Sequence, residues 1–108
     1  MSYKVLAIPH FNRALKRLAD KYPSLKKEIA ELYDQLEKDP KKGTSIGQDC
    51  YKIRLSISSK GRGKSGGARV ITYISIVETE VYLLTIYDKS EKEDLNPKEL
   101  KEFLSQIP

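Results

Sequence analysis

Basic side chains gather in one part of this 108-residue chain, in a pattern suited to binding a polyphosphate. Residues 41–69 carry a net charge of +7, because their only acid is Asp49, whereas the whole chain carries +5. The basic residues of this segment are Lys41, Lys42, Lys52, Arg54, Lys60, Arg62, Lys64 and Arg69. The basicity is therefore a local patch, and a patch of this sign calls for an anionic partner such as nucleic acid.

Strand-like alternation predicts that several of these cations share one face of a sheet. In residues 51–57 and 68–76, apolar side chains alternate with charged or phenolic ones. If helices cover the apolar face, the opposite face is an open cationic floor with phenols in it. Its members are Lys52, Arg54, Arg69, Tyr73 and Tyr87.

The loop between these strands adds three more cations, Lys60, Arg62 and Lys64, on a glycine-rich rim. Glycine lets backbone amides approach a phosphate closely, so the loop and the floor together predict a groove that follows a phosphate backbone. Residues 61–66 match G-x-G-x-x-G formally. A strand pattern follows them where a dinucleotide site needs a helix, so this type of site is excluded.

A strand and two helices are predicted before this region. Residues 3–8 form a short apolar run, and Pro9 opens a helical pattern that extends to about residue 21. A second amphipathic helix, with Pro23 in its first turn, ends at Asp39 because Pro40 disfavours a helical residue before it. The two helices should form an antiparallel hairpin.

Three strands and a last helix complete the order β-α-α-β-β-β-α. The strands are expected at 51–57, 68–76 and 81–87, and the helix over 96–107, where Asn96 and Glu99 can form a capping box. In the last strand we expect Tyr82, Leu84 and Ile86 on one side and Leu83, Thr85 and Tyr87 on the other. This order predicts one α+β domain over residues 1–108, with a mostly antiparallel four-stranded sheet and a helical hairpin on one face.

Composition excludes several classes of site. Cys50 and His10 are the only cysteine and histidine, so a structural zinc site, a Cys/His nucleophilic pair and a disulfide framework are not expected. We interpret both residues as structural and expect neither a metal nor a cofactor. No apolar run approaches the roughly 20 residues that a membrane span needs, and the single cysteine suits a reducing compartment, so we expect a cytoplasmic protein.

Two segments carry a family resemblance: GKSGGARVITYIS, residues 63–75, and VYLLTIYDKSEKEDL, residues 81–95. They strongly resemble the RelE/HigB-type toxins of bacterial and archaeal toxin–antitoxin systems, and the similarity extends over nearly the whole chain. It implies a RelE-like fold. It also implies an endoribonuclease that enters the ribosomal A site, cuts the mRNA there and is held inactive by a cognate antitoxin, usually a DNA-binding protein encoded next to it.

The resemblance also implies roles for individual residues. By position, Arg54, Arg69, Tyr87 and Lys89 match the catalytic set of the family, and Lys60, Arg62 and Lys64 match its basic loop. We expect these three loop residues to bind RNA together with Lys52 and Tyr73. Some members of the family have a histidine in the catalytic set, whereas this chain has none after His10.

Cleavage of RNA through its 2′-hydroxyl needs a base, cations for the transition state and an acid for the leaving oxygen. Arg54 and Arg69 suit the cationic role because guanidinium groups stay protonated and bind phosphate with two donors. Proton transfer would fall to the Tyr87 phenol or to a lysine amine. We expect crowding among like charges to lower the pKa of these groups, namely Tyr87, Lys52, Lys64 and Lys89. Which group is the acid and which the base stays open.

Two other functions remain alternatives to a ribosome-dependent mRNA endoribonuclease. The ParE-type branch of the same fold poisons DNA gyrase without nuclease chemistry, and the set Arg54, Arg69, Tyr87 and Lys89 argues against it. The second alternative is an RNA-binding domain without catalysis. Growth arrest on expression without a partner would distinguish a toxin from such a domain.

Overall fold

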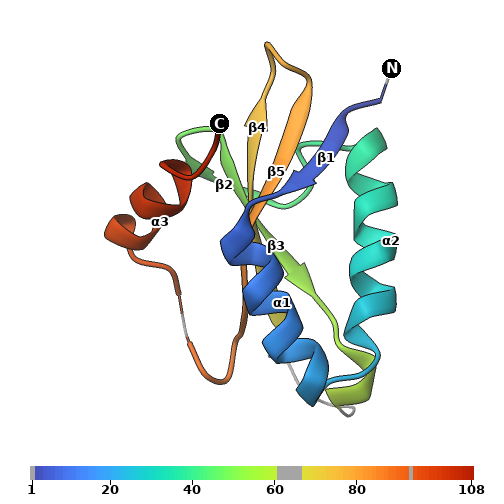
Figure 1. Cartoon of the computed structure of the whole chain (residues 1–108). Helices are drawn as coiled ribbons and strands as arrows, with labels where there is room; N and C mark the ends of the chain where they lie inside the picture. Colours follow the sequence, from blue (N-terminus) through green and yellow to red (C-terminus); the bar gives the residue numbers. More distant parts are fainter. Residues whose placement is uncertain (1, 61–66, 93) are drawn as a thin grey trace.

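The computed structural model describes residues 2–60, 67–92 and 94–108, apart from the side chain of Lys60 (Figure 1). Its elements are β1 (Lys4–Ala7), α1 (Pro9–Lys21), α2 (Leu25–Lys38), β2 (Thr44–Gly47), β3 (Cys50–Leu55), a 3-10 turn at Ser58–Lys60, β4 (Ala68–Ser75), β5 (Glu80–Asp88) and α3 (Pro97–Leu104). The expected order of elements is confirmed, with β2 added. None of the helices in the described ranges is long and apolar enough to cross a membrane.

A five-stranded sheet in the order β1-β5-β4-β3-β2 forms the centre of the molecule. β1 pairs parallel with β5, and the other neighbours are antiparallel. β2 is the strand that the sequence did not predict. All four of its residues are exposed, so TSIG lacks the alternation by which a half-buried strand is recognised.

α1 and α2 cover one face of the sheet, as expected for the helical hairpin (Figure 1). α2 buries one stripe of side chains, Leu25, Ile29, Leu32 and Leu36. At the end of α1 the hydroxyl of Tyr22 donates a buried hydrogen bond of 2.8 Å to the carboxylate of Asp88, the last residue of β5. We call the face that the hairpin covers the helix face.

Strand register assigns the functional candidates to the opposite face. Val70 pairs with Ile53 on one side and Ile86 on the other, and all three are buried under the helices. The next row, Arg54, Arg69 and Tyr87, must point the other way because side chains alternate along a strand. We call this second side the cationic face.

A β-bulge at Leu84 changes the expected alternation along β5. Ile71 pairs with Thr85, but its neighbour Thr72 pairs with Leu83, so Leu84 is an extra residue in β5. Tyr82 consequently lies on the cationic face with Thr85, and the expectation that Tyr82 and Thr85 lie on opposite sides is wrong.

α3 packs on the cationic face and covers part of it, whereas the sequence predicted that this face is open. The expected capping box is confirmed, with the Asn96 side chain accepting from the backbone of Glu99 and the Glu99 side chain from that of Asn96. The helix ends at Leu104, before Ile107. The Phe103 ring stacks on His10, with centroids 4.3 Å apart. Because Phe103 is apolar and needs burial, α3 could not stay clear of the sheet.

Candidate nucleic-acid interface

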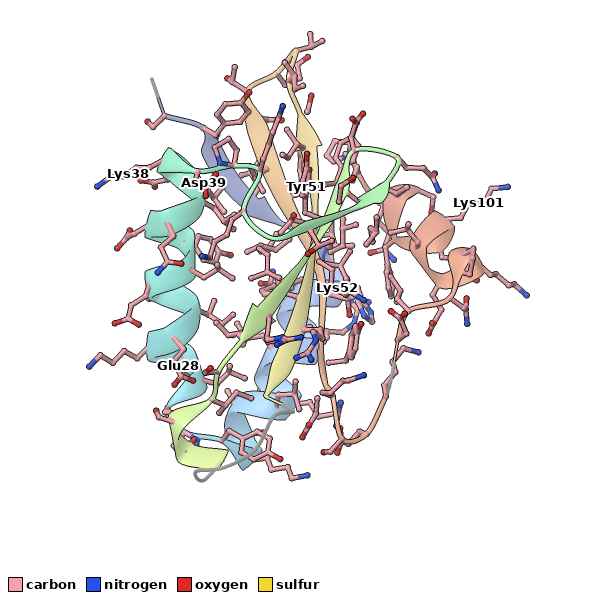
Figure 2. All side chains as sticks on the ribbon, turned by 180° about the vertical axis from the view of Figure 1, so that it is seen from behind. Glu28, Lys38, Asp39, Tyr51, Lys52 and Lys101 are labelled. Carbon is pink, nitrogen blue, oxygen red and sulfur yellow. The ribbon has the colours of Figure 1, made fainter. Side chains whose placement is uncertain are left out.

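Three cations of the cationic face line one hollow. Lys52, Arg54 and Arg69, together with Gly43 and Thr44 from the chain beside them, enclose about 220 Å³. Arg54 and Arg69 are direct cross-strand partners, and Lys52 lies two residues along the same face of β3. Figure 2, which looks at this face, shows Lys52 near the middle of the sheet. We call this site the cationic hollow.

The two arginines of the hollow differ in how firmly they are held. Arg69 is 7% exposed, and its Nη1 donates a hydrogen bond of 3.1 Å to the carbonyl oxygen of Ala68. Arg54 is exposed to solvent. A buried, hydrogen-bonded guanidinium beside a solvent-exposed one is an arrangement that can bind a phosphate without reorganising the whole site. The hollow therefore has the charge and the donors to accept one phosphate group.

Tyr87 lies in the same row as the arginines, but it is buried. It pairs with Arg69 in register and is 5% exposed. Burial raises the pKa of its phenol to about 12, the Asp94 carboxylate adds to this, and the Arg69 charge opposes it. The expectation of a lowered pKa for Tyr87 is therefore wrong, because burial outweighs the effect of the Arg69 charge. The phenol therefore keeps its proton near neutral pH, so it can donate a proton but cannot act as a base there, and the raised pKa makes it a weaker acid than a free tyrosine.

Asp94 is the site residue that the sequence reasoning missed. Its Oδ1 lies 3.5 Å from Nζ of Lys52 and accepts a hydrogen bond of 2.8 Å from the backbone of Leu95. The Leu95 N–H and the charges of Lys52 and Lys89 hold the pKa of Asp94 below its usual value. An ionised carboxylate thus stands at the edge of the hollow. No sequence signal marks it, because its contact with Lys52 spans 42 residues.

Lys89 follows β5 and is close enough to Asp94 for its charge to lower the pKa of that carboxyl. The backbone N–H of Lys89 donates to the carbonyl of Gly67 at 3.1 Å, which ties the end of β5 to the start of β4. The side chains of Lys60, Arg62 and Lys64 lie outside the described residues.

The described end of the basic loop is joined to α2. Glu28 accepts hydrogen bonds of 2.8 Å from both the backbone and the hydroxyl of Ser58. Ser24 and Ser59 are joined by a hydroxyl–hydroxyl contact of 2.8 Å. This network fixes the segment that leads from β3 into the loop, and none of its polar residues was singled out from the sequence.

Tyr73 shares the cationic face but not the cationic hollow. It is half-buried, its ring centroid lies 6.5 Å from that of Tyr82, and it borders a separate hollow of about 410 Å³ with Gln48, Asp49, Leu104 and Ile107. The register places Tyr73 four residues beyond Arg69 on β4, a distance of about 13 Å along the strand. Lys52 and Tyr73, the two expected RNA-binding residues with described side chains, therefore belong to different parts of the face.

Cys50 and His10 have the surroundings of structural residues. Cys50 is fully buried, and burial raises the pKa of its thiol to about 11, so the reactive thiolate is disfavoured. The Nε2 of His10 is 3.0 Å from Oγ1 of Thr85. Burial and the charge of Arg13 lower the pKa of the imidazole. The ring also borders a hollow of about 350 Å³ between α1 and α3 that Tyr87 lines from the sheet.

Comparison with known proteins identifies the family and the fold of this chain. Residues 4–106 match the family described as the RelE toxin of the RelE / RelB toxin–antitoxin system. A double arginine-to-alanine mutant of the E. coli toxin RelE in the free state is similar over 100% of both chains, with 17% identity and a TM-score of 0.60. The RelBE2 toxin–antitoxin complex from Mycobacterium tuberculosis matches 82% of this chain and 99% of the other, with 19% identity and a TM-score of 0.59. At these identities the structures support the fold, and the family match covers nearly the whole sequence. The chain therefore belongs to the RelE family of toxins of toxin–antitoxin systems.

Proposed function

We propose that this toxin is an endoribonuclease that cuts mRNA in the A site of the ribosome and thereby stops translation. The observation that carries the proposal is the cationic hollow, where Lys52, Arg54 and Arg69 converge beside a protonated phenol, Tyr87. Cations that surround one small volume suit the doubly charged transition state of phosphate chemistry better than a small neutral substrate.

In the proposed reaction the RNA 2′-hydroxyl attacks the adjacent phosphorus and the bond to the 5′-oxygen breaks. The products are a 2′,3′-cyclic phosphate and a 5′-hydroxyl, and no metal or cofactor takes part. Arg54 and Arg69 bind the phosphate oxygens as negative charge builds up. Tyr87 donates a proton to the leaving oxygen, because its phenol is protonated at neutral pH and is still a stronger acid than the alcohol that leaves. The base that takes the proton of the 2′-hydroxyl stays open between a lysine amine and a group of the ribosome.

Tyr87 is 5% exposed, so its acid role requires that RNA reach a hydroxyl that residues around α3 now cover. Leu95, Glu99 and Phe103 line the hollow that Tyr87 borders. We infer that these side chains shift when the ribosome binds.

Expression of the chain without a partner tests the function in cells. Growth should stop, and primer extension on cellular mRNA should show new 5′ ends inside translated reading frames. Growth arrest with intact mRNA and altered DNA supercoiling would replace this function with gyrase poisoning. Normal growth with RNA binding alone would indicate a domain without catalysis.

A cognate antitoxin is the second part of the proposal. A surface with this charge would otherwise bind cellular RNA without discrimination and with strong dependence on salt. The inhibitor should cover the cationic face or displace α3 from it. Arg54 is exposed and Arg69 is 7% exposed in the chain on its own, so arginine-modifying reagents give a direct readout at Arg54. Modification of Arg54 should fall when the antitoxin from the adjacent reading frame is bound, and unchanged modification would mean that inhibition acts elsewhere.

A further inference from the structure

A second hollow lies on the cationic face, at the end away from Arg69. Its walls are Tyr73, Leu104 and Ile107, and its mouth is the turn between β2 and β3 at Gln48 and Asp49. Both views show the tip of the β2–β3 hairpin beside α3 (Figure 1, Figure 2). The hollow measures about 410 Å³. One aromatic wall, two aliphatic side chains and a polar rim are the features of a site for a flat, partly polar ligand.

The turn at this hollow has a strained backbone. Gly47 pairs with Cys50, so Gln48 and Asp49 are the two central residues of a hairpin loop, and both have positive φ, 54° and 61°. Such a loop prefers Asn-Gly because larger side chains are disfavoured in this conformation. Gln48 and Asp49 therefore stand where smaller residues would fold more easily. Strain of this kind concentrates where side chains serve a ligand.

The surrounding contacts hold the strained turn in place. The backbone N–H of Ile74 donates to the carbonyl of Asp49 at 2.9 Å, which fixes the turn against β4. The Tyr73 ring lies 6.5 Å from the ring of Tyr82. Gln48 and Asp49 are exposed residues that line this hollow together with Tyr73, so an amide, a carboxylate and a phenol ring are available around it.

We propose that this hollow binds one nucleobase of the RNA whose phosphate lies in the cationic hollow, and that it prefers a base with an exocyclic amine. An aromatic ring gives any base a surface to stack on. A carboxylate only accepts hydrogen bonds, so Asp49 favours a base that offers an exocyclic amino group, as guanine, adenine and cytosine do, and Gln48 can pair with the same edge. Uracil has no exocyclic amine and binds less tightly. This inference rests on the proposed function for its ligand, RNA.

The geometry links the two hollows in one path. Tyr73 and Arg69 are on the same face of β4, about 13 Å apart, and a short stretch of extended RNA can bridge them. Lys52 lies between them in register, opposite Ile71. The bound RNA would therefore place a phosphate at Arg69, pass Lys52 and turn a base toward Tyr73. The selected base lies near the cut without being adjacent to it.

Binding of short RNA that cannot be cleaved tests the pocket without any cleavage. Oligonucleotides with 2′-O-methyl groups would carry one abasic site, moved along the strand, and their affinity would be measured by fluorescence anisotropy. For the wild-type chain, one abasic position should weaken binding about 5- to 150-fold, the range for loss of one stacked base. Tyr73→Leu should bind intact RNA as weakly as the wild type binds that abasic RNA, and should not distinguish the abasic position. Tyr73→Phe should behave as the wild type.

Two further variants distinguish a loss of base binding in the pocket from a change in the stability of the protein. Tyr33 is half-buried on α2, on the helix face, so Tyr33→Leu makes the same change away from RNA and should keep the dependence on the abasic position. Asp49→Gly removes the carboxylate and also the strain of a positive φ. It should raise the Tm while abolishing the preference for adenine or cytosine over uracil. A merely structural Asp49 would give the higher Tm with the preference unchanged.

The outcomes keep this inference distinct from the proposed function. An affinity that is equally weakened at every abasic position, or a Tyr73→Leu variant with wild-type position dependence, overturns the pocket. Either result leaves cleavage at the cationic hollow untouched. A chain that binds RNA with the expected position dependence but leaves mRNA intact on the ribosome would retain the pocket and overturn the nuclease.

Discussion

The two faces of the sheet are built from the same strands and carry different properties. On the helix face the row Ile53, Val70 and Ile86 is fully packed beneath α1 and α2. One residue along, the row Arg54, Arg69 and Tyr87 places charge and a phenol on the other side. Adjacent residues in the sequence thus serve stability and candidate chemistry in turn. Substitutions of neighbours should therefore affect different measurements.

Tyr87→Phe should have the largest effect on cleavage if the hydroxyl is the acid. The ring and its packing stay, and only the hydroxyl is lost, so the rate should fall about 10²- to 10⁴-fold with binding nearly unchanged. Single-turnover cleavage on ribosomes programmed with mRNA measures the chemical step. A variant that retains more than about a third of the wild-type rate would remove Tyr87 from the catalytic set.

The pH profile of the same assay sharpens the role of Tyr87. Its pKa is raised to about 12, so the phenol stays protonated as the pH rises from neutral. As an acid it should therefore cause no loss of rate between about pH 7 and pH 9. A loss of rate in that range that is present in the wild type and absent in Tyr87→Phe would mean that the phenol ionises there when RNA is bound.

Arg69→Ala should be the next largest change. It removes a buried cation that we propose binds the phosphate, and it should lower the rate about 10²- to 10³-fold, the usual result of losing one group that stabilises the transition state. Arg69→Lys is the matched control, because it keeps the charge and loses the paired donors. Its rate should lie between those of the wild type and Arg69→Ala. Equal rates for Arg69→Ala and the wild type would separate the hollow from catalysis.

Asp94→Asn should have a small effect, and it should strengthen RNA binding rather than weaken it. The Asp94 carboxylate is 3.5 Å from Lys52, where it competes with an RNA phosphate for that cation. Both side chains are partly exposed, so the affinity for RNA should rise only about two- to fivefold at low salt. The same change should lower the pKa of Tyr87, because Asp94 raises it. Weaker RNA binding by Asp94→Asn would show that the carboxylate supports the site instead.

Val70→Ala should leave cleavage unchanged and tests the other face. Val70 is fully buried and adjacent to Arg69 in sequence. Its truncation should lower the free energy of unfolding by about 1–3 kcal/mol through lost burial and the cavity that remains. Urea denaturation measures the first effect and single-turnover cleavage the second. A large loss of rate in folded Val70→Ala would mean that the two faces are not independent.

Local patterns in the sequence were sufficient for most elements of the fold. The helical hairpin, the three longer strands and the capping box of α3 follow from the spacing of apolar residues and from Asn96 and Glu99. β2 was missed because an exposed edge strand has no apolar alternation. The bulge at Leu84 was missed because alternation in one strand does not reveal an extra residue relative to its neighbour.

The candidate site could be predicted only as far as strand alternation extends. It brought Arg54, Arg69 and Tyr87 into one row, and the register agrees. Asp94 was missed because its contact with Lys52 depends on how the segment after β5 returns across the sheet. The pKa of Tyr87 was expected in the wrong direction because counting cations does not show that residues near α3 bury the phenol. Long-range packing, rather than local pattern, decides both features.

The most direct test of the central claim is cleavage by purified protein on ribosomes that carry a labelled mRNA. The cationic hollow predicts one cut at the A-site codon, with a 2′,3′-cyclic phosphate and a 5′-hydroxyl at the ends. The cut should be nearly abolished by Arg69→Ala and retained by its neighbour variant Val70→Ala. Intact mRNA with wild-type protein, or equal cleavage by folded Arg69→Ala, would contradict the claim that the cationic face is the nuclease site.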